Sequence, residues 1–593
     1  MTRTPLRPLA RILAARAHGQ NPDAVEKENI RLRHEDMRDQ DLQRAESRLL
    51  ILGVFFVLAF IAVGTRMGML ATSEPVEPRA AVAGNSIVAS RADIVDRNGR
   101  ILATNLATYS LYAQPQDMVD PIRAAAELHE IFPDLDHEKL LRQFTGKRTF
   151  VWIRRKLSPE QKQAVHDIGE PGLLFGPREM RLYPNGRLAS HILGGASFGR
   201  EAVHSAEVIG VAGIEKAYDD VLRDPARAGQ PLSLSVDLSV QAAARTVLYG
   251  GMQLMNAKGA TAVLMDAHSG EIVSLVSLPD FDPNDRPAPP TEGDPSDSPL
   301  FNRAVQGLYE LGSTFKILTA AQALDIGLVN PNTIIDITGP IEKSGHKIRD
   351  FRDYGPELSV SDVIVKSSNI GTARLATQIG IERQKDFLDS LGFFEPTPVE
   401  LIEARGAKPL TQRNWSEITT MTVSFGHGLA ASPLHLAAAY ASLLNGGTRV
   451  EPTLLKREIA PRGEQVISAA TSAHARQMLR AVVERGTASL GDVAGYAIGG
   501  KTGTADKPRP EGGYYDDRVI ATFATVFPAH DPRYVLVVTL DEPVETSGVE
   551  PRRTAGWTAV PVAAEIIRRT APLLGLRPYD GWRDTTALAL SEN

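Results

Sequence analysis

One uncharged stretch near the N-terminus limits the possible folds of this chain more than any other feature. From Leu49 to Thr65 the sequence reads LLILGVFFVLAFIAVGT, 17 residues without a charge, between Arg48 and Arg66. A helix that is apolar on every side needs a membrane or a large protein core around it, and about 17 residues are the lower limit for spanning a bilayer. Because an arginine can extend its charged end toward water, the apolar helix can continue past Arg66. The sequence therefore predicts a transmembrane helix over residues 49–71.

The charges on either side of this helix predict its orientation. The first 48 residues contain ten Lys or Arg, whereas only Arg66 and Arg79 lie between the apolar run and Arg91. Basic residues are retained on the cytoplasmic side. We therefore expect a cytoplasmic tail at residues 1–48, a single pass through the lipid of the inner membrane, and a periplasmic remainder. A buried core helix is the alternative, but such helices rarely lack a polar face. A cleaved signal peptide fits poorly, because the preceding segment is too long and no small-x-small site follows.

Length and composition set broad limits on the rest of the chain. At 593 residues it exceeds what one hydrophobic core supports, so two or more domains are expected. We expect a pedestal module at residues 72–230, a second domain at 231–577 and a C-terminal tail at 578–593. A net charge of -6 gives no basic surface for nucleic acid. The absence of cysteine excludes disulfides, zinc–thiolate sites and a cysteine nucleophile.

Turn residues and apolar alternation predict mixed α+β structure outside the membrane. Asn98-Gly99 between apolar runs predicts a hairpin with a type I′ turn, in which both central residues need a positive φ. We expect the charged residues around it to lock the fold of an elongated, non-catalytic pedestal. A second hairpin is predicted from strands at 259–266 and 271–277, and residues 279–299 are expected to form a surface loop. Further strands are expected at 519–527 and 534–540, and a helix near 560–573.

The first of three short motifs is Ser313-Thr314-Phe315-Lys316. The apolar spacing after Ser313 predicts a helix that begins at this serine and ends near Gly327. Residues three apart on a helix share a face, so the Lys316 amine can activate the Ser313 hydroxyl as a nucleophile. A serine helix cap beside a solvated lysine is the alternative. A second serine-to-lysine copy, Ser344 to Lys347, contains Gly, lacks a following apolar helix and is expected to be a loop.

Two further motifs follow in order along the chain. Ser367-Ser368-Asn369 lies between helical runs and can place a hydroxyl and an amide in a cleft, although a simple helix cap is the alternative. Lys501-Thr502-Gly503-Thr504 follows Gly499-Gly500, whose lack of side chains would let a substrate backbone approach an edge strand. Residues 495–502 also satisfy the phosphate-binding pattern G-x-x-x-x-G-K-[ST]. That reading is rejected because the pattern needs a buried strand before it and a helix after it.

As a set, these motifs resemble those of the penicillin-binding protein and serine β-lactamase superfamily. The stretch from Arg91 to Ala103, the Gly213-Ile214-Glu215 stretch and the membrane anchor make the chain similar to a class B penicillin-binding protein over residues 85–575. Lys501 to Ala505 followed by Lys507 most resembles the cell-division branch. The resemblance implies an α+β transpeptidase domain, with an antiparallel sheet flanked by helices, that cross-links peptidoglycan stem peptides during septum formation.

The resemblance also implies a role for each motif residue. Ser313 would attack the penultimate D-Ala carbonyl and form an acyl-enzyme, with Lys316 as base. Lys501 would favour the neutral form of Lys316. Ser367 would relay a proton to the leaving amine, and Asn369 would hold the substrate amide. The terminal carboxylate would be bound by Thr502 and Thr504, with Gly503 between them, while the backbone N–H groups of Ser313 and Thr504 form an oxyanion hole.

The resemblance implies no metal and no cofactor. It implies three kinds of partner: D-Ala-D-Ala stem peptides, β-lactams, and division proteins that include a polytopic lipid-II glycosyltransferase. Three other functions remain as alternatives: an elongation-type transpeptidase, a membrane-anchored β-lactamase or β-lactam sensor, and an inactive divisome scaffold. A class A β-lactamase would contain Glu-x-x-Leu-Asn, but Ala441 occupies the Glu position before Leu444-Asn445.

Overall fold

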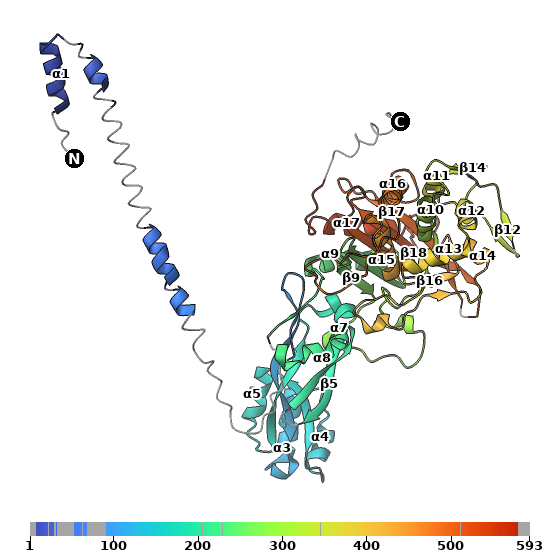
Figure 1. Cartoon of the computed structure of the whole chain (residues 1–593). Coiled ribbons are helices and arrows are strands. Elements are labelled where there is room, and N and C mark those ends of the chain that lie inside the picture. The colour runs from blue at the N-terminus through green and yellow to red at the C-terminus, as the bar shows by residue number, and fades with distance from the viewer. Residues whose placement is uncertain are drawn as a thin grey trace. The chain divides into compact units, whose positions relative to one another are not determined.

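The computed structural model describes residues 7–19, 21, 23–28, 31, 52–61, 63–67, 91–202, 205–227, 229–343, 345–509 and 511–578. The chain divides into two compact units, Met1–Ile87 and Val88–Asn593. Helix α1 (Arg7–Ala17) and three shorter helical stretches at 23–28, 52–61 and 63–67 are the regular structure described in the first unit. The ribbon of the whole chain is shown in Figure 1.

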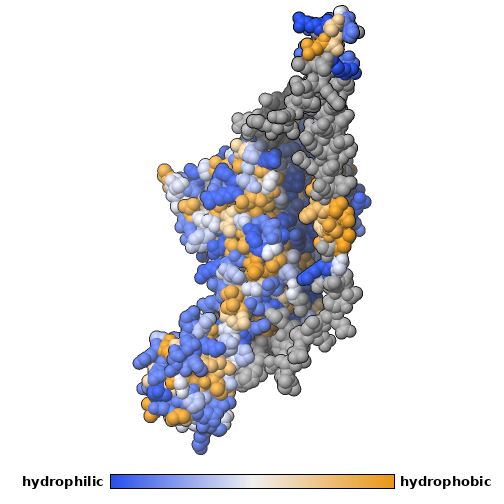
Figure 2. Space-filling model, turned by 90° about the vertical axis from the view of Figure 1, so that its left-hand side faces the viewer, coloured by the Kyte–Doolittle hydropathy of each residue, from blue (hydrophilic) through white to orange (hydrophobic). Residues whose placement is uncertain are grey.

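The predicted transmembrane segment lies only partly within the described residues. Residues 52–61 and 63–67 are helical and exposed, and Figure 2 shows a run of hydrophobic surface along this helical stretch. Residues 49–51, 62 and 68–71 fall outside the described part, as do most of the predicted tails at 1–48 and 578–593. Among the described residues, no helix combines the length and the hydropathy that a membrane crossing requires.

The second unit begins with the predicted hairpin. Strand β1 (Ile94–Val95) pairs antiparallel with β2 (Ile101–Ala113), which confirms the hairpin at Asn98-Gly99. The predicted turn type is wrong, because only Gly99 of these two residues has a positive φ, +80°. The Asp96 side chain stabilises the turn instead: its Oδ1 accepts hydrogen bonds from the backbone N–H of Asn98 at 2.9 Å and of Arg100 at 2.8 Å. A carboxylate that binds the turn's own N–H groups removes the need for a second left-handed residue.

The pedestal is a small sheet with its own core. Strand β2 pairs with β3 (Val151–Leu157) and with β4 (Leu173–Leu182). Asp120, Asp136 and Ser158 cap the N-termini of α3, α4 and α5 by accepting a hydrogen bond from the third residue of each helix. The remaining pedestal elements are α3 (Pro121–Ile131), α4 (His137–Phe144), α5 (Pro159–Asp167), α6 (Ser190–Leu193), the paired strands β5 (Gly195–Ala202) and β6 (Ser205–Ala212), α7 (Gly213–Ala217) and α8 (Asp219–Leu222).

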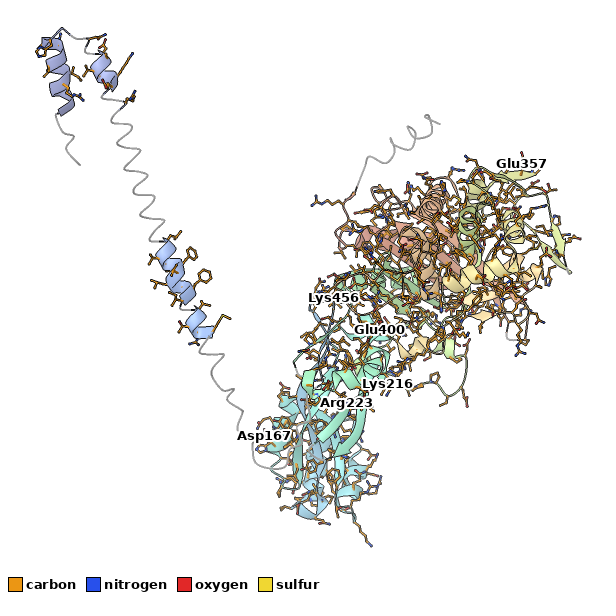
Figure 3. All side chains as sticks on the ribbon, viewed as in Figure 1. Asp167, Lys216, Arg223, Glu357, Glu400 and Lys456 are labelled. Carbon is orange, nitrogen blue, oxygen red and sulfur yellow. The ribbon has the colours of Figure 1, made fainter. Side chains whose placement is uncertain are left out.

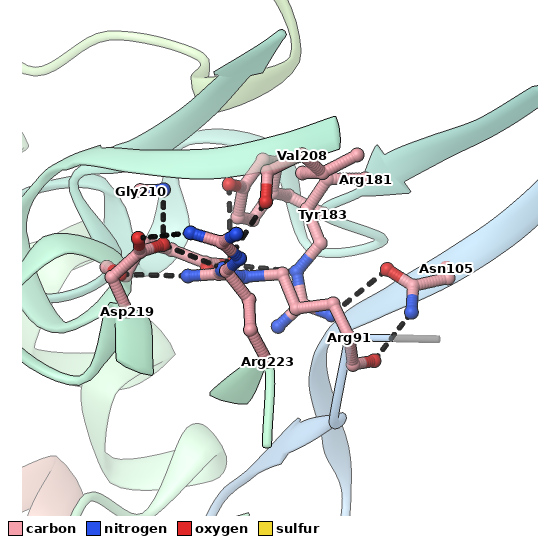
Figure 4. Close-up of polar contacts among 9 residues, drawn as sticks. Arg91, Asn105, Arg181, Tyr183, Val208, Gly210, Asp219 and Arg223 are labelled. Carbon is pink, nitrogen blue, oxygen red and sulfur yellow. Dashed lines mark hydrogen bonds and ion pairs between the residues drawn. The ribbon is translucent and has the colours of Figure 1, made fainter. Parts of the chain in front are cut away.

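A buried ionic network holds the base of this module together (Figure 4). The fully buried carboxylate of Glu215 accepts hydrogen bonds from Arg91 Nε and from Arg181 Nε, each at 2.7 Å. Arg91 also donates to Asp219 at 2.7 Å, and Tyr183 donates its hydroxyl to Glu215 at 3.3 Å. These charged side chains can be buried because each is hydrogen-bonded to a group of opposite charge. These contacts fit the structural role expected for the charged residues at the start of the module.

Side chains near the hairpin also contact the domain that follows. Arg97 donates to Glu271 at 3.0 Å, and the Lys456 ammonium donates to the Arg97 carbonyl at 3.0 Å. Within the second domain, the Glu400 carboxylate accepts the backbone N–H of Leu454, two residues before Lys456, at 2.8 Å. Figure 3 labels Glu400 and Lys456. Strand β1 further pairs in parallel with β7 (Leu232–Ser233), so backbone pairing joins the hairpin to the start of the second domain.

The second domain is built on a five-stranded antiparallel sheet with the order β17-β18-β19-β8-β9. Helices α9 and α17 pack on each other and on this sheet, and α15 and α16 do the same as a second pair. This arrangement confirms the expected antiparallel sheet flanked by helices. The elements are β8 (Gly259–Asp266), β9 (Ile272–Leu278), β17 (Gly499–Pro508), β18 (Tyr514–Phe527), β19 (Tyr534–Asp541), α9 (Leu238–Leu254), α15 (Pro433–Leu444), α16 (Ala469–Arg485) and α17 (Ala559–Thr570).

The predicted elements of this domain agree with the structure to within a few residues. Strands β8, β9 and β19 match their predicted spans, whereas β18 begins five residues earlier, at Tyr514 rather than at 519. Residues 279–299 form an irregular loop with short 3-10 turns. A helical lobe completes the domain: α10 (Lys316–Asp325), α11 (Val360–Lys366), α12 (Asn369–Ile379), α13 (Ile381–Ser390) and α14 (Glu417–Val423), with the short strands β10 (Tyr309–Glu310), β11 (Ile334–Asp336), β12 (Ile341–Lys343), β13 (His346–Ile348), β14 (Glu357–Ser359), β15 (Leu410–Thr411) and β16 (Leu429–Ala431).

Candidate active site

Ser313 lies in a tight turn rather than in the first turn of an α-helix. Residues Gly312–Phe315 form a 3-10 helix, and α10 begins only at Lys316. The prediction that the α-helix begins at Ser313 is therefore wrong by three residues. The turn is set by the positive φ of Gly312, +57°, and by the Thr314 hydroxyl, which donates to the Leu311 carbonyl at 2.9 Å. Ser313 itself is half-buried.

Glycines hold this turn by direct backbone packing. A Cβ on Gly426, whose φ is +82°, would lie 2.0 Å from the Gly312 carbonyl oxygen, and the Gly312 N–H donates to the Gly426 carbonyl at 3.2 Å. On the other side, a Cβ on Gly503 would lie 2.2 Å from the Leu311 carbonyl oxygen. Neither position has room for a side chain. Segments far apart in the sequence therefore fix the position of Ser313 through main-chain atoms.

The two motif lysines converge on the hydroxyl of Ser367. Lys316 Nζ donates to Ser367 Oγ at 3.1 Å, and Lys501 Nζ donates to the same oxygen at 3.0 Å. Lys316 Nζ also contacts the Ser367 carbonyl, and Lys501 Nζ donates to the Thr502 carbonyl at 3.1 Å. Ser367 can present its side chain and its carbonyl to one amine because it adopts a left-handed conformation with φ +64° at the end of α11. The three predicted motifs therefore meet in space.

Burial makes both amines easier to deprotonate. Lys316 and Lys501 are each 0% exposed. Burial lowers the pKa of Lys316 well below its usual value, the nearby charge of Lys501 lowers it further, and the charge of Asp350 opposes this shift. Burial lowers the pKa of Lys501 to about 7. A buried amine that is neutral near neutral pH can accept a proton from a neighbouring hydroxyl.

Asp350 contacts the second motif, and the sequence analysis did not single it out. The Ser368 hydroxyl donates to Asp350 Oδ2 at 2.6 Å, and the backbone N–H of Ile370 donates to Asp350 Oδ1 at 3.1 Å. The N–H of Asn369 donates to Oδ1 as well, so one carboxylate caps the N-terminus of α12. The Asn369 side-chain amide donates to the Arg349 carbonyl at 2.8 Å. No periodicity or spacing marks an aspartate that lies in a loop almost twenty residues before its partners.

The third motif lies on β17, which is an edge strand of the sheet. The hydroxyls of Thr502 and Thr487 lie 2.7 Å apart, and Thr504 Oγ1 accepts the backbone N–H of Ala555 at 3.0 Å. The motif itself lies in a strand, and the next described regular element is another strand, β18, so the rejection of the phosphate-binding loop is confirmed.

The expectation for the two glycines before this motif needs correction. The side-chain positions of Gly499 and Gly500 face protein rather than open space: a Cβ on Gly500 would lie 2.7 Å from the Phe523 ring, and one on Gly499 would lie 3.3 Å from the backbone nitrogen of Arg480. These glycines permit close packing of the strand against its own domain. Among the described strands, β17 pairs with β18 on one side and ends the sheet on the other.

Three aromatic residues near the motifs make contacts of their own. His427 and Tyr514 have ring centroids 6.4 Å apart, and the Tyr514 hydroxyl donates to Glu310 at 3.1 Å. Glu310 also accepts the N–H of Gly428 at 2.7 Å. The Arg518 guanidinium lies over the Tyr515 ring, with its central carbon 4.4 Å from the ring centroid. These contacts connect the β17–β18 hairpin with the strand before Ser313, and they give no reason to assign a proton-transfer role to any of the three residues.

The geometry defines a class of protein. The site has a half-buried serine, Ser313, and a buried lysine, Lys316, one turn further along the chain. Lys316 shares the hydroxyl of a second serine, Ser367, with the second buried lysine, Lys501. These are the parts of an acyl-transfer site with a serine nucleophile. The chain matches two family models, the penicillin binding protein transpeptidase domain over residues 260–568 and the penicillin-binding protein dimerisation domain over residues 86–228.

Relatives with similar sequences agree with these matches. The chain is 35% identical over 565 residues to a protein of Caulobacter vibrioides named probable peptidoglycan D,D-transpeptidase FtsI, covering 92% of each chain. It is 32% identical to the probable peptidoglycan D,D-transpeptidase PenA of Neisseria gonorrhoeae, covering 83% of this chain and 86% of the relative. A crystal structure of penicillin binding protein 3 from Mycobacterium tuberculosis, complexed with aztreonam, superposes with a TM-score of 0.63 at 27% identity, covering 83% of this chain and 97% of the other. The chain belongs to the penicillin-binding protein transpeptidase family.

Proposed function

We propose that this protein is a peptidoglycan D,D-transpeptidase that cross-links stem peptides through a serine acyl-enzyme during septal wall synthesis. Family membership and the similarity to a relative named FtsI support the reaction class and the septal role. The observation that carries the chemistry is the convergence of Lys316 and Lys501 on Ser367, next to the turn that holds Ser313. No metal or cofactor has a part in this reaction.

In the acylation half-reaction, neutral Lys316 takes the proton of the Ser313 hydroxyl as its oxygen attacks the penultimate D-Ala carbonyl. The low pKa of Lys316, caused by burial and by the charge of Lys501, keeps the amine available as a base. When the tetrahedral intermediate collapses, the peptide C–N bond breaks and the ester remains on Ser313. The terminal D-Ala leaves as an amine after it receives a proton through the Ser367 hydroxyl.

In the second half-reaction, the amine of another stem peptide attacks the ester carbonyl. The amine gives up a proton through Ser367 and Lys316, the C–O bond to Ser313 breaks, and a new peptide bond forms. The serine hydroxyl is thereby regenerated. The hydrogen-bonded pair of Ser367 and Lys316 therefore acts as an acid in the first half-reaction and as a base in the second.

The remaining motif residues position the substrate in this proposal. Thr502 and Thr504 on the edge strand bind the terminal carboxylate with Gly503 between them, and Asn369 binds a substrate amide. The backbone N–H groups of Ser313 and Thr504 stabilise the oxyanion. The short distance between the Gly312 turn and Thr504 supports this pairing, because a Cβ on Gly312 would lie 2.9 Å from the Thr504 carbonyl oxygen.

Labelling with a fluorescent penicillin tests the nucleophile. The expected result is a single adduct on Ser313, located by mass spectrometry of the modified peptide and absent from Ser313→Ala. Ser344→Ala alters the other serine-to-lysine copy and serves as the matched control, which should label normally. Stoichiometric labelling of folded Ser313→Ala would refute the proposal.

Three measurements separate the alternatives. A transpeptidase keeps its penicilloyl adduct for hours, whereas a β-lactamase turns it over rapidly. An inactive scaffold would support division with Ser313→Ala in place of the original chain, and a septal enzyme would not. A fluorescent fusion at mid-cell supports the septal role, and one along the lateral wall supports an elongation-type enzyme.

We also propose that residues 49–71 anchor the protein in the inner membrane, with residues 1–48 in the cytoplasm and the pedestal and transpeptidase domains in the periplasm. The uncharged run and the basic residues before it support this topology. A polytopic lipid-II glycosyltransferase is the expected partner. Because the chain has no cysteine, single cysteines introduced at residues 20 and 80 report topology directly. A membrane-impermeant maleimide applied to spheroplasts should label only the second position.

A further inference from the structure

A cleft next to the second motif has no part in the mechanism above. It has a volume of about 480 Å³ and lies between residues 337–340 and residues 349–356, with Ile370 of α12 in its wall. Strand β14 begins directly after this loop, at Glu357, which Figure 3 labels. Asp350 forms part of the wall and also binds the hydroxyl of Ser368, the neighbour of Ser367. A wall residue of the cleft thus binds Ser368, which is next in the chain to Ser367, the serine that both lysines contact.

The cleft is lined by two arginines and two aspartates, and its arginines are suited to an anionic ligand. Both carboxylates already accept hydrogen bonds from the chain: Asp350 caps α12, and Asp353 accepts the N–H of Gly355 at 2.9 Å. Arg349 and Arg352 are exposed at the cleft, and within the described residues neither guanidinium forms an ion pair. Arginine is well suited to bind a carboxylate, because its fork of N–H donors matches the two oxygens.

The other side of the cleft is apolar. Ile337, Pro340 and Ile370 line it, and Tyr354 and Pro356 face it from the loop. An apolar floor with two cations at the rim suits a ligand that has a short hydrocarbon part and a carboxylate at its end. Simple inorganic anions would use only the rim.

We propose that this cleft is a subsite for a carboxylate-bearing segment of a stem peptide, with the carboxylate bound by Arg349 and Arg352. This inference rests on the proposed transpeptidase function. The segment comes from the donor stem, which is acylated on Ser313, or from the acceptor stem, which supplies the amine. Both offer the same carboxylate chemistry to a cleft whose wall includes Asp350, the partner of the Ser368 hydroxyl.

The test compares full-length protein with the Arg349→Gln/Arg352→Gln variant on matched synthetic peptides. In the donor arm, a stem pentapeptide ending in D-Ala-D-Ala has its internal carboxylates either free or converted to amides, and released D-Ala is measured. In the acceptor arm, a stem tetrapeptide with free or amidated carboxylates competes for a common acyl donor, and cross-linked product is measured. Acylation by benzylpenicillin reports the integrity of Ser313 and its neighbours. Arg405→Gln/Arg462→Gln, which alters two exposed arginines in other loops, is the charge-matched control.

The variant should lose roughly 3- to 10-fold in kcat/KM with the free-carboxylate peptide in one arm, as expected for a charge-assisted contact in a partly solvated site. It should change less than about twofold with the amidated peptide and with benzylpenicillin. A loss confined to the donor arm identifies the donor stem, and one confined to the acceptor arm identifies the acceptor stem. Equal losses on free and amidated peptides, or no loss in either arm, would overturn the subsite. If the unsubstituted protein releases no D-Ala from any donor, the proposed function has failed instead.

Discussion

The backbone contact between Gly426 and Gly312 gives a quantitative prediction for Gly426→Ala. The new methyl carbon would be placed 2.0 Å from the Gly312 carbonyl oxygen. Carbon and oxygen atoms in ordinary contact stay more than roughly 3 Å apart, so the two segments must separate by at least about 1 Å. Gly312 directly precedes Ser313, and a displacement of about 1 Å at a reacting atom costs on the order of 100-fold in rate. We therefore expect acylation by benzylpenicillin to slow by about that factor.

The matched control for this prediction is Gly392→Ala. Gly392 has a φ of +85°, close to the +82° of Gly426, but a Cβ there would meet nothing within 4 Å. Both variants incur the cost of a left-handed alanine, about 1–2 kcal/mol, and only Gly426→Ala has the collision. The assay is the second-order rate of acylation, measured by fluorescence at a temperature where both variants remain folded by circular dichroism. If the two variants acylate at the same rate, backbone packing does not position Ser313 and the reasoning is refuted.

Three further predictions concern charged groups. Asp350→Asn removes a charge that raises the pKa of Lys316, so the acidic limb of the pH profile of the acylation rate should move to lower pH. The maximal rate should fall roughly tenfold because α12 is capped more weakly. An acidic limb that moves to higher pH would contradict this prediction. Burial lowers the pKa of Lys501 to about 7 from 10.5, and between these values the unfolded chain binds a proton that the folded chain lacks, so this group makes stability rise with pH across that window. Lys501→Met removes this dependence. Scanning calorimetry gives the Tm of the variant minus the Tm of the unsubstituted protein, and this difference should be larger at pH 6 than at pH 10. The same difference at both pH values would show that the amine is not buried. Glu215→Gln weakens the hydrogen bonds to two buried arginines and should lower the free energy of unfolding by about 3 kcal/mol. Urea denaturation measures this loss. A loss below about 0.5 kcal/mol would show that the ionic network contributes little to stability.

Sequence patterns predicted the main elements well where periodicity decides the structure. The strands of the central sheet and the helices on either side of Ser367 follow from apolar runs and turn residues. Local chemistry changed two details that periodicity cannot report. Asp96 binds the N–H groups of its own turn, so Asn98 needs no left-handed conformation. Gly312 sets a 3-10 turn, so the α-helix begins at Lys316 instead of Ser313.

The candidate site was predictable only as far as its motifs extend. Their order brought Ser313, Lys316 and Lys501 into one prediction, and the structure places both lysines on Ser367. Asp350 was missed because tertiary folding alone brings its loop to α12. The packing of Gly426 on Gly312 was missed for the same reason: the sequence shows a glycine, but not the backbone against which it rests.

Backbone packing around the nucleophile also limits how this enzyme can change. At Gly312, Gly426 and Gly503 every substitution adds at least one carbon where a main-chain atom already stands within 3 Å. Evolution therefore has no small step available at these positions, since the smallest addition is already too large. Gradual changes in the position of Ser313 must therefore come from side chains in the surrounding loops, such as the one that contains Asp350.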